Sequence, residues 1–225
     1  MAHSIEVEFH DTSVHHALHI ANSAGHTMAA LSAEALLLAS PATASSDAGG
    51  GGGGGGSRIV CVHLASWDGN KEWTTQLPDG EQAMAVALGA GWAAVATSRH
   101  LLRFFTTAGV QRAAVALPGA ALCLAGHGRH LLVAFHCGAA PAYGLLDVEP
   151  TSAVGYRWRG HGQQPLPLAA GRAQLAWAGF SDEGQAAFMD TTGLVQVRPL
   201  CIQRLEPKAF DQARRVNRPL ATSKR

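Results

Sequence analysis

The sequence L-G-A-G-W-A-A-V-A-T-S-R-H-L-L-R-F-F-T-T-A-G-V-Q, from Leu88 to Gln111, indicates the fold class of the chain. Short apolar runs alternate in it with turns rich in glycine and polar residues, which is typical of antiparallel strands joined by tight turns. We therefore predict strands at Trp92–Thr97 and Leu101–Thr106, preceded by Ala83–Leu88 and followed by Val110–Leu117. Four short strands in about 35 residues match the size of one β-propeller blade.

The same rhythm continues over most of the chain. Ser4–Phe9 alternates apolar and acidic residues, as a half-buried edge strand does, and such a first strand can complete the last blade of a propeller. In the last unit, Ala173–Arg198, the turns Ser181–Gly184 and Asp190–Gly193 separate strands. The other predicted strands are Thr27–Leu31, Ala35–Ser40, Ile59–Ala65, Glu72–Leu77, Ala120–Gly126, Leu131–His136, Tyr143–Val148 and Val154–Trp158. The pattern predicts an all-β protein rich in antiparallel meanders.

Composition places the chain among globular proteins and argues against a membrane protein. It has 225 residues, of which 47% are hydrophobic and 15% charged. The longest uncharged apolar stretch, Ala83–Ala96, is interrupted by Gly-Ala-Gly and is too short to span a bilayer. The N-terminus has no basic segment followed by an apolar one, so we expect no secretory signal and a reducing compartment.

Charge is distributed unevenly along the chain. Residues 201–225 contain seven Lys and Arg against Glu206 and Asp211, a net charge of +5, whereas the first 200 residues carry −4. Two interpretations of this basic tail remain open: it contacts nucleic acid or acts as a nuclear address, or it is a non-native end. The acidic body favours protein partners over nucleic acid.

Histidines concentrate in one segment near the N-terminus. His10, His15, His16 and His19 lie close to Asp11, and imidazole with carboxylate is a suitable ligand set for zinc. The alternative is a polar surface loop between two strands, which we favour because no second-shell partner is evident. We therefore assign no metal ligand and no cofactor.

Four cysteines, Cys61, Cys123, Cys137 and Cys201, are spaced too widely for a zinc site. Three of them lie in apolar runs that resemble strands, so we expect buried free thiols. His136 adjoins Cys137, but no second Cys/His pair follows at ligand spacing.

Eight consecutive glycines, Gly49–Gly56, interrupt the strand rhythm. A phosphate-binding P-loop needs Gly-Lys-Ser/Thr at the start of a helix, but Ser57 and Arg58 lead into a predicted strand. We interpret residues 41–57 as a flexible Gly-rich insertion in a hairpin loop, which costs little free energy because loop closure depends weakly on length.

No motif indicates catalysis. The segment G-F-S-D-E-G, Gly179–Gly184, has the wrong spacing for a nucleophile elbow, and it falls in a predicted hairpin. Ser181 is the residue to test for esterase activity, because a Ser-His-Asp triad is defined by geometry and not by sequence order. We expect no enzyme activity and no catalytic residue.

Several blocks together resemble a known family. They are I-E-V-E-F-H-D-T-S-V-H-H-A-L-H-I-A-N, S-W-D-G-N-K-E-W at 66–73, A-L-G-A-G-W-A-A-V-A-T-S, L-L-R-F-F-T-T-A-G-V-Q, A-G-H-G, and 175–193. This pattern resembles the middle propeller of the WD-repeat and HMG-box DNA-binding proteins, the minichromosome-loss replisome adaptors. The resemblance implies a six-bladed β-propeller that forms homotrimers and links the replicative helicase to DNA polymerase alpha–primase in replication and chromosome cohesion. It also implies a nuclear, chromatin-associated protein with no catalytic activity.

The resemblance also sets the expected domain organisation. We expect residues 1–200 to form a partial middle propeller of about four to five blades, and residues 201–225 to be a divergent, disordered tail. We expect DNA contact to be indirect, or weak and through this tail. No partner-binding residue can be assigned. The alternative function is a β-propeller interaction scaffold that acts outside replication.

Overall fold

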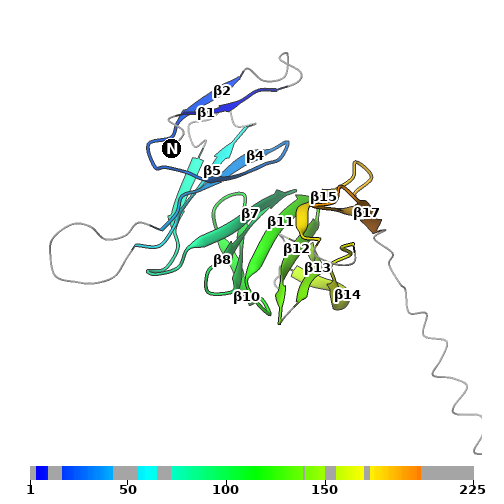
Figure 1. Cartoon of the computed structure of the whole chain (residues 1–225). Coiled ribbons are helices and arrows are strands. Elements are labelled where there is room, and N and C mark those ends of the chain that lie inside the picture. The colour runs from blue at the N-terminus through cyan, green and yellow to red at the C-terminus, as the bar shows by residue number, and fades with distance from the viewer. Residues whose placement is uncertain are drawn as a thin grey trace, which may run out of the picture.

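The computed structural model describes residues 4–9, 17–42, 55–64, 72–138, 140–149, 156–169 and 173–198. All the regular elements in these residues are β-strands, and every pairing between them is antiparallel (Figure 1). Within the same residues, no helix long and apolar enough to cross a membrane occurs. The all-β prediction is therefore confirmed.

In the described residues, seventeen strands form five sheets that follow one another along the chain. The N-terminal hairpin sheet consists of β1 (Ser4–Val7) and β2 (Leu18–Ala21). The first blade contains β3 (Met28–Leu31), β4 (Ala35–Ala39), β5 (Arg58–His63) and β6 (Glu72–Gln76). The second blade contains β7 (Ala83–Gly89), β8 (Trp92–Thr97), β9 (Leu101–Thr106) and β10 (Gln111–Ala116). The third blade contains β11 (Ala121–His127), β12 (His130–Cys137), β13 (Ala140–Val148) and β14 (Tyr156–Pro165), and the C-terminal sheet contains β15 (Leu175–Phe180), β16 (Ala186–Asp190) and β17 (Val195–Arg198).

Neighbouring sheets pack face to face, and each interface is a separate apolar core. Leu36 and Leu38 of β4 contact the N-terminal hairpin sheet, whereas Leu37, between them, packs against the second blade. The same strand thus contributes to two cores, because successive side chains of a strand point to opposite faces. All five residues of β4 are buried in consequence. This explains why the second strands of the blades are continuous apolar runs without a polar face.

The stretch that indicated the fold class forms most of the second blade. Strands β8 and β9 have the predicted bounds, and β7 and β10 differ from prediction by one residue at the ends. Gly109 lies in the turn between β9 and β10 with a φ of +88°, and its missing Cβ would stand 2.9 Å from the Trp73 ring. A side chain at this position is excluded both by the backbone conformation and by the ring.

Two details of the prediction are wrong. Residues Leu18–Ala21 form a strand, β2, where we expected a polar loop, and this strand pairs with β1 from Ser4↔Ala21 to Val7↔Leu18. Strand β1 thus belongs to a two-stranded sheet with β2. Strand β14 also extends to Pro165, well beyond the predicted end at Trp158, because its pairing with β13 continues past a bulge.

A repeat that the pattern analysis missed follows the fourth strand of each complete blade. The residues Leu77, Leu117 and Leu166 are 3%, 6% and 8% exposed, and a proline follows each of them. The leucine anchors the outer strand in the core, and proline, which has no N–H, suits the point at which pairing ends. A Leu-Pro pair thus marks the passage from one blade to the next.

Candidate interaction surfaces on the inner strands

The first strand of each blade lies next to the first strand of its neighbour. Strand β7 contacts β3 on one side and β11 on the other, and β11 also contacts β15. Each of these strands pairs with one partner only, so one edge of each lies at the inner side of the arc of sheets. The inner strands therefore form the wall that a propeller presents to its central channel.

Three of the four inner strands carry a β-bulge at the same place. The pairing register shifts at Met84 in β7, at Leu122 in β11 and at Ala176 in β15. A bulge turns the extra residue away from the regular alternation of the strand. Met84 and Leu122 are accordingly 47% and 39% exposed despite their apolar side chains. The bulges place apolar side chains near the start of these inner strands, at one open end of the arc that the five sheets form.

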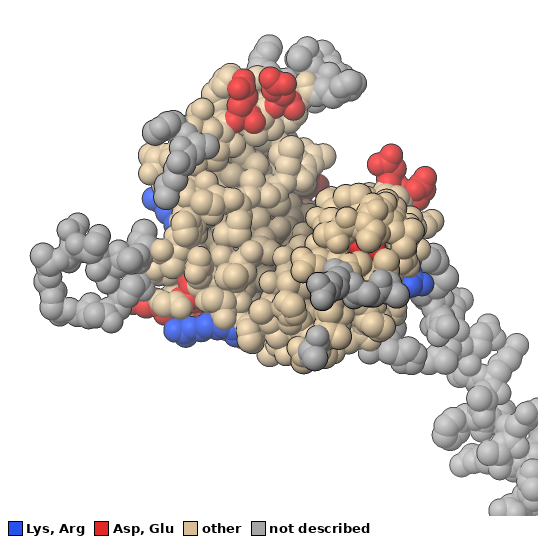
Figure 2. Space-filling view, in the orientation of Figure 1, with Lys and Arg blue, Asp and Glu red and all other residues tan. Residues whose placement is uncertain are grey.

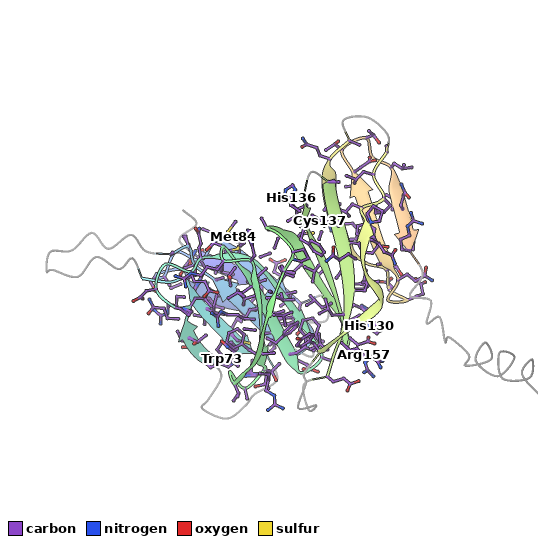
Figure 3. The ribbon with its side chains drawn as sticks, turned by 90° about the horizontal axis from the view of Figure 1, so that it is seen from below. Trp73, Met84, His130, His136, Cys137 and Arg157 are labelled. Carbon is purple, nitrogen blue, oxygen red and sulfur yellow. The ribbon has the colours of Figure 1, made fainter. Side chains whose placement is uncertain are left out.

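A hollow of about 650 Å³ opens beside Leu122, between the third blade and the C-terminal sheet. Its walls include Leu122, Cys123, His136, Pro141, Leu168 and Trp177. Figure 3 shows His136 and Met84 at the same end of the molecule. Burial raises the pKa of the Cys123 thiol to about 11, so this thiol is neutral at physiological pH. The hollow suits an uncharged, largely apolar group.

A second hollow, of about 360 Å³, lies at the other mouth among the turns that join first and second strands. The backbones of adjacent blades approach closely there: a Cβ on Gly126 would stand 1.9 Å from the carbonyl oxygen of Leu88. The Trp92 indole N–H and the Ala90 amide both donate to the Gly128 carbonyl, at 2.9 and 2.7 Å. These contacts fix the spacing of the second and third blades.

A buried ion pair lies in the second blade. Arg103 donates from Nε and Nη2 to the two carboxylate oxygens of Glu81, at 2.8 and 2.7 Å. Side-chain exposure is 12% for Arg103 and 1% for Glu81. The hydrogen bonds from Arg103 lower the pKa of Glu81 below its usual value, against the opposing effect of burial. Because the two charges satisfy each other, we assign this pair a structural role.

A second polar cluster joins three strands of the third blade, β12, β13 and β14. His130 Nδ1 lies 2.9 Å from Asp147 Oδ1, and Arg157 Nη2 lies 3.8 Å from Asp147 Oδ2. His130 and Asp147 are also cross-strand partners in the β12–β13 register. Figure 3 places His130 and Arg157 at the end of the third blade opposite His136. The cluster is therefore separate from the 650 Å³ hollow.

Charged side chains are sparse on much of the surface. Figure 2 shows acidic side chains over the N-terminal hairpin sheet and wide uncharged areas over the blades that face the viewer. The hairpin contributes Glu6 and Glu8, and His19 Nδ1 lies 3.5 Å from Glu6. On the described residues of this face, no continuous basic stripe of the kind that tracks a phosphate backbone is visible.

Comparison with known proteins places the chain in a family. A family model described as minichromosome loss protein, Mcl1, middle region, matches residues 1–211. The chain belongs to this family. The match continues past Cys201 to residue 211, into the segment that we expected to diverge from the family.

Relatives of known sequence agree with this assignment. The chain is 41% identical over 200 residues to human WD repeat and HMG-box DNA-binding protein 1, and 39% identical over 202 residues to its Xenopus laevis counterpart. The Arabidopsis thaliana Protein ENHANCER OF LHP1 1 is 28% identical over 202 residues. Each alignment covers 86% of this chain, but it spans only 16%, 16% and 19% of the respective relative. The resemblance to a minichromosome loss protein is thus confirmed for a middle segment of much longer proteins.

Comparison with a solved structure supports the fold alone. The chain matches a chain of the mitotic checkpoint complex with a TM-score of 0.51 and 12% identity, over 77% of this chain and 46% of the other. A match to HIRA(644-1017) has a TM-score of 0.47 and 16% identity, over 72% and 49%. With its stacked four-stranded sheets, the described part of the chain has the fold of a partial β-propeller.

The residues that the sequence suggested as metal ligands or as a nucleophile do not come together in the described part of the structure. Within the described residues, no group of three His, Cys, Asp or Glu side chains is arranged to hold a metal ion. His10, Asp11, His15 and His16 lie outside the described residues, as does Cys201, and His19 is part of β2. The Ser181 hydroxyl donates to Glu183 Oε2 at 2.9 Å in an exposed turn, so this serine stabilises the turn.

The burial of the cysteines and the packing at the end of the glycine run, Gly49–Gly56, differ in part from what the sequence predicted. Cys61, Cys123 and Cys137 are free thiols as predicted, but only Cys61 is fully buried, and Cys137 is exposed because it ends β12. Gly56, the last residue of the run, is buried, and a Cβ there would stand 2.1 Å from the Leu77 carbonyl oxygen. The run therefore ends in a tightly packed segment that leads into β5. Most of the run lies outside the described residues.

Proposed function

We propose that this chain is a non-enzymatic scaffold segment of the replication machinery. In this proposal it acts in the nucleus, on chromatin, and helps to connect the replicative helicase to DNA polymerase alpha–primase during replication and chromosome cohesion. The observation that carries the proposal is the family match over residues 1–211. Since the chain spans only 16% of its human relative, the proposal concerns one module of a larger adaptor.

The chemistry of the described surfaces supports a binding role. The larger hollow is lined mainly by apolar side chains, and Leu122 stands partly exposed at its rim. The buried ionisable groups of the second blade, Glu81 and Arg103, neutralise each other and are not directed into either hollow. An apolar concavity at the mouth of a propeller can receive an apolar side chain of a protein partner.

A pull-down tests the proposed function. Tagged 225-residue chain is incubated with nuclear extract, and bound subunits of DNA polymerase alpha–primase and of the replicative helicase are measured by immunoblot. We expect both to be recovered. Recovery of neither, from a chain shown to be folded, contradicts the replication role and favours a scaffold that acts elsewhere.

A matched pair of variants tests whether the 650 Å³ hollow beside Leu122 contributes to partner binding in this pull-down. Leu122→Glu places a carboxylate at its rim, and Val110→Glu places one in an exposed turn away from both hollows. If the hollow binds a partner, Leu122→Glu lowers recovery several-fold and Val110→Glu leaves it unchanged. Equal recovery from the two variants assigns binding to another surface.

Self-association as a homotrimer and a weak DNA contact through residues 201–225 belong to the same proposal. The mass of the purified chain, measured by light scattering over a dilution series, tests the trimer, for which three chains of 23.4 kDa are expected. DNA retention that falls steeply with salt, and that is lost when residues 201–225 are deleted, tests the tail contact. Retention that survives the deletion contradicts it.

A further inference from the structure

The larger hollow, of about 650 Å³, follows the edge of strand β15. Six consecutive residues, Ala173–Ala178, line it on the side of the C-terminal sheet. Successive side chains of a strand point to opposite faces of its sheet, so a cavity against one face is lined mainly by every second residue. Lining by consecutive residues therefore indicates that the hollow lies along the strand edge, where main-chain groups are accessible as well.

The opposite wall is the edge of a second inner strand. Leu122 and Cys123, which are consecutive in β11, line the hollow from the third blade. Strands β11 and β15 lie beside each other (Figure 1). In the described residues β11 pairs only with β12, and β15 pairs only with β16. The hollow thus separates two unpaired strand edges, and it lies between two sheets and not at an end of the arc.

The main chain at these two edges can form further hydrogen bonds. In an antiparallel pair, alternate residues direct their N–H and C=O groups to the partner strand, and the residues between them direct these groups away from it. The free edges of β11 and β15 therefore present backbone donors and acceptors to the hollow. An occupant that covers these groups without pairing them binds weakly, because an unpaired buried polar group costs free energy.

The side chains around the hollow favour an uncharged occupant. None of the described residues that line it is Asp, Glu, Lys or Arg. Leu122, Pro141 and Leu168 contribute apolar side chains. A phosphate or a charged side chain would lose its hydration here without gaining a counter-ion from these walls. Charge complementarity therefore favours an uncharged aliphatic or aromatic group.

An extended peptide meets both requirements. Its backbone can pair with a strand edge, as in β-strand addition, while alternate side chains enter the hollow. A small apolar molecule would leave the edge groups of β11 and β15 without partners. Residues 201–225 of this chain carry seven Lys and Arg, so they match the uncharged walls poorly. The described strands of a second copy are held in folded sheets, so the occupant that fits is a linear segment of another protein.

We propose that the hollow between β11 and β15 binds an extended, uncharged segment of a partner protein. One apolar side chain of this segment lies beside Leu122, and its backbone forms hydrogen bonds with the strand edges. This inference rests on the non-enzymatic binding role proposed above and adds the class of ligand to it. In β-strand addition the main-chain hydrogen bonds provide affinity and the side-chain pocket provides specificity. The partner is therefore recognised through a short linear sequence.

A library of displayed linear peptides, selected on the purified and folded 225-residue chain, provides the probe. We expect the enriched sequences to share an apolar residue within an uncharged stretch. A synthetic copy of an enriched peptide should bind Leu122→Glu about tenfold more weakly than the wild type, because a carboxylate then stands at the rim. The control Val110→Glu, at an exposed position outside the hollow, should bind this peptide as the wild type does. N-methylation of alternate backbone nitrogens in the peptide should also weaken binding, since it removes the pairing donors.

Thiol protection locates the bound peptide on the wild-type chain, so this measurement does not depend on the folding of Leu122→Glu. Cys123 lines the hollow, whereas Cys137 is exposed and is not among the lining residues. An excess of the peptide should slow the alkylation of Cys123 by N-ethylmaleimide several-fold and leave that of Cys137 unchanged. Mass spectrometry of the digested chain measures both rates.

The proposed ligand is overturned if no peptide is enriched, if the enriched peptides are strongly charged, or if Cys123 is not protected. Equal binding by the wild type and a folded Leu122→Glu also overturns it. Peptides that bind equally well after N-methylation overturn the strand addition. The pull-down of replication proteins fails separately: protection of Cys123 without recovery of polymerase or helicase subunits supports the peptide site and removes the replication role, and recovery without protection does the reverse.

Discussion

Arg103 and Glu81 are joined by two parallel hydrogen bonds of 2.8 and 2.7 Å inside the second blade, although 22 residues separate them in sequence. Glu81 lies in the connection from β6 to β7, and its carbonyl accepts from the Ser57 amide at 3.0 Å. Arg103 comes from β9, on the far side of β8. The pair therefore ties the entry of the second blade to its third strand and, through Ser57, to the first blade.

Removing one charged side chain of this ion pair should lower the free energy of unfolding more than removing both. Arg103→Met leaves the Glu81 carboxylate buried and unpaired, and we expect it to lower the free energy of unfolding by about 3–5 kcal/mol. The double variant Glu81→Met/Arg103→Met leaves no buried charge and should recover most of this loss. Urea unfolding of the three proteins measures the difference, and equal losses in the single and double variants would contradict the argument.

The same pair should make stability depend on acid. Hydrogen bonds from Arg103 hold the pKa of Glu81 below its usual 4.5 in the folded chain. The stabilisation is therefore complete above the unfolded-state pKa and is lost as pH falls from about 4.5 through the lower folded-state value. We expect the urea midpoint of the wild type to fall more steeply below pH 4.5 than that of the double variant. Parallel curves would assign acid sensitivity to other carboxylates.

Close backbone contact between blades should make Gly126 irreplaceable. Gly126→Ala drives a methyl group into the Leu88 carbonyl, 1.9 Å from the added carbon, and we expect a loss of about 3 kcal/mol or more. Gly193→Ala serves as the control: it has open space but a φ of +84°, which costs alanine about 1–2 kcal/mol. Thermal unfolding ranks the two variants. If Gly193→Ala is the more harmful, backbone conformation and not crowding governs these positions.

The three described cysteines should react with alkylating reagents in order of exposure. Cys137 is exposed, whereas burial raises the pKa of the Cys61 and Cys123 thiols to about 11. Because the thiolate is the nucleophile, a short pulse of N-ethylmaleimide on the folded chain should modify Cys137 first and Cys61 last. Peptide mapping by mass spectrometry gives the order, and the same pulse in urea provides the reference. Rapid labelling of Cys61 would indicate that the first blade opens readily.

The sequence predicted the strands wherever apolar runs are bounded by turn residues, as at Trp92–Thr97, whose bounds agree with the structure. It missed β2, because four residues beside a histidine-rich segment give too short an alternation to distinguish from a loop. The recurrence of Leu-Pro after Leu77, Leu117 and Leu166 is present in the sequence and could have located the blade boundaries. It was concealed because the blades differ in length.

The candidate surfaces were less accessible to sequence reasoning. The partnership of Glu81 with Arg103 depends on strand register, which periodicity alone does not define. The exposure of Leu122 arises from a bulge, and an apolar residue within an apolar strand gives no sign that it is turned outward.

The second strands of the blades, each shared between two cores, also determine how the molecule comes apart. Strand β8 contributes Ala94 to the core shared with the third blade and Ala93 to the core shared with the first. Unfolding of an inner sheet would disrupt two apolar interfaces, because such a sheet packs against a neighbour on each face. Unfolding of the sheet at either end would disrupt only one. Unfolding should thus proceed from the ends inward, and amide hydrogen exchange should be slowest in β8 and faster toward β1 and β17.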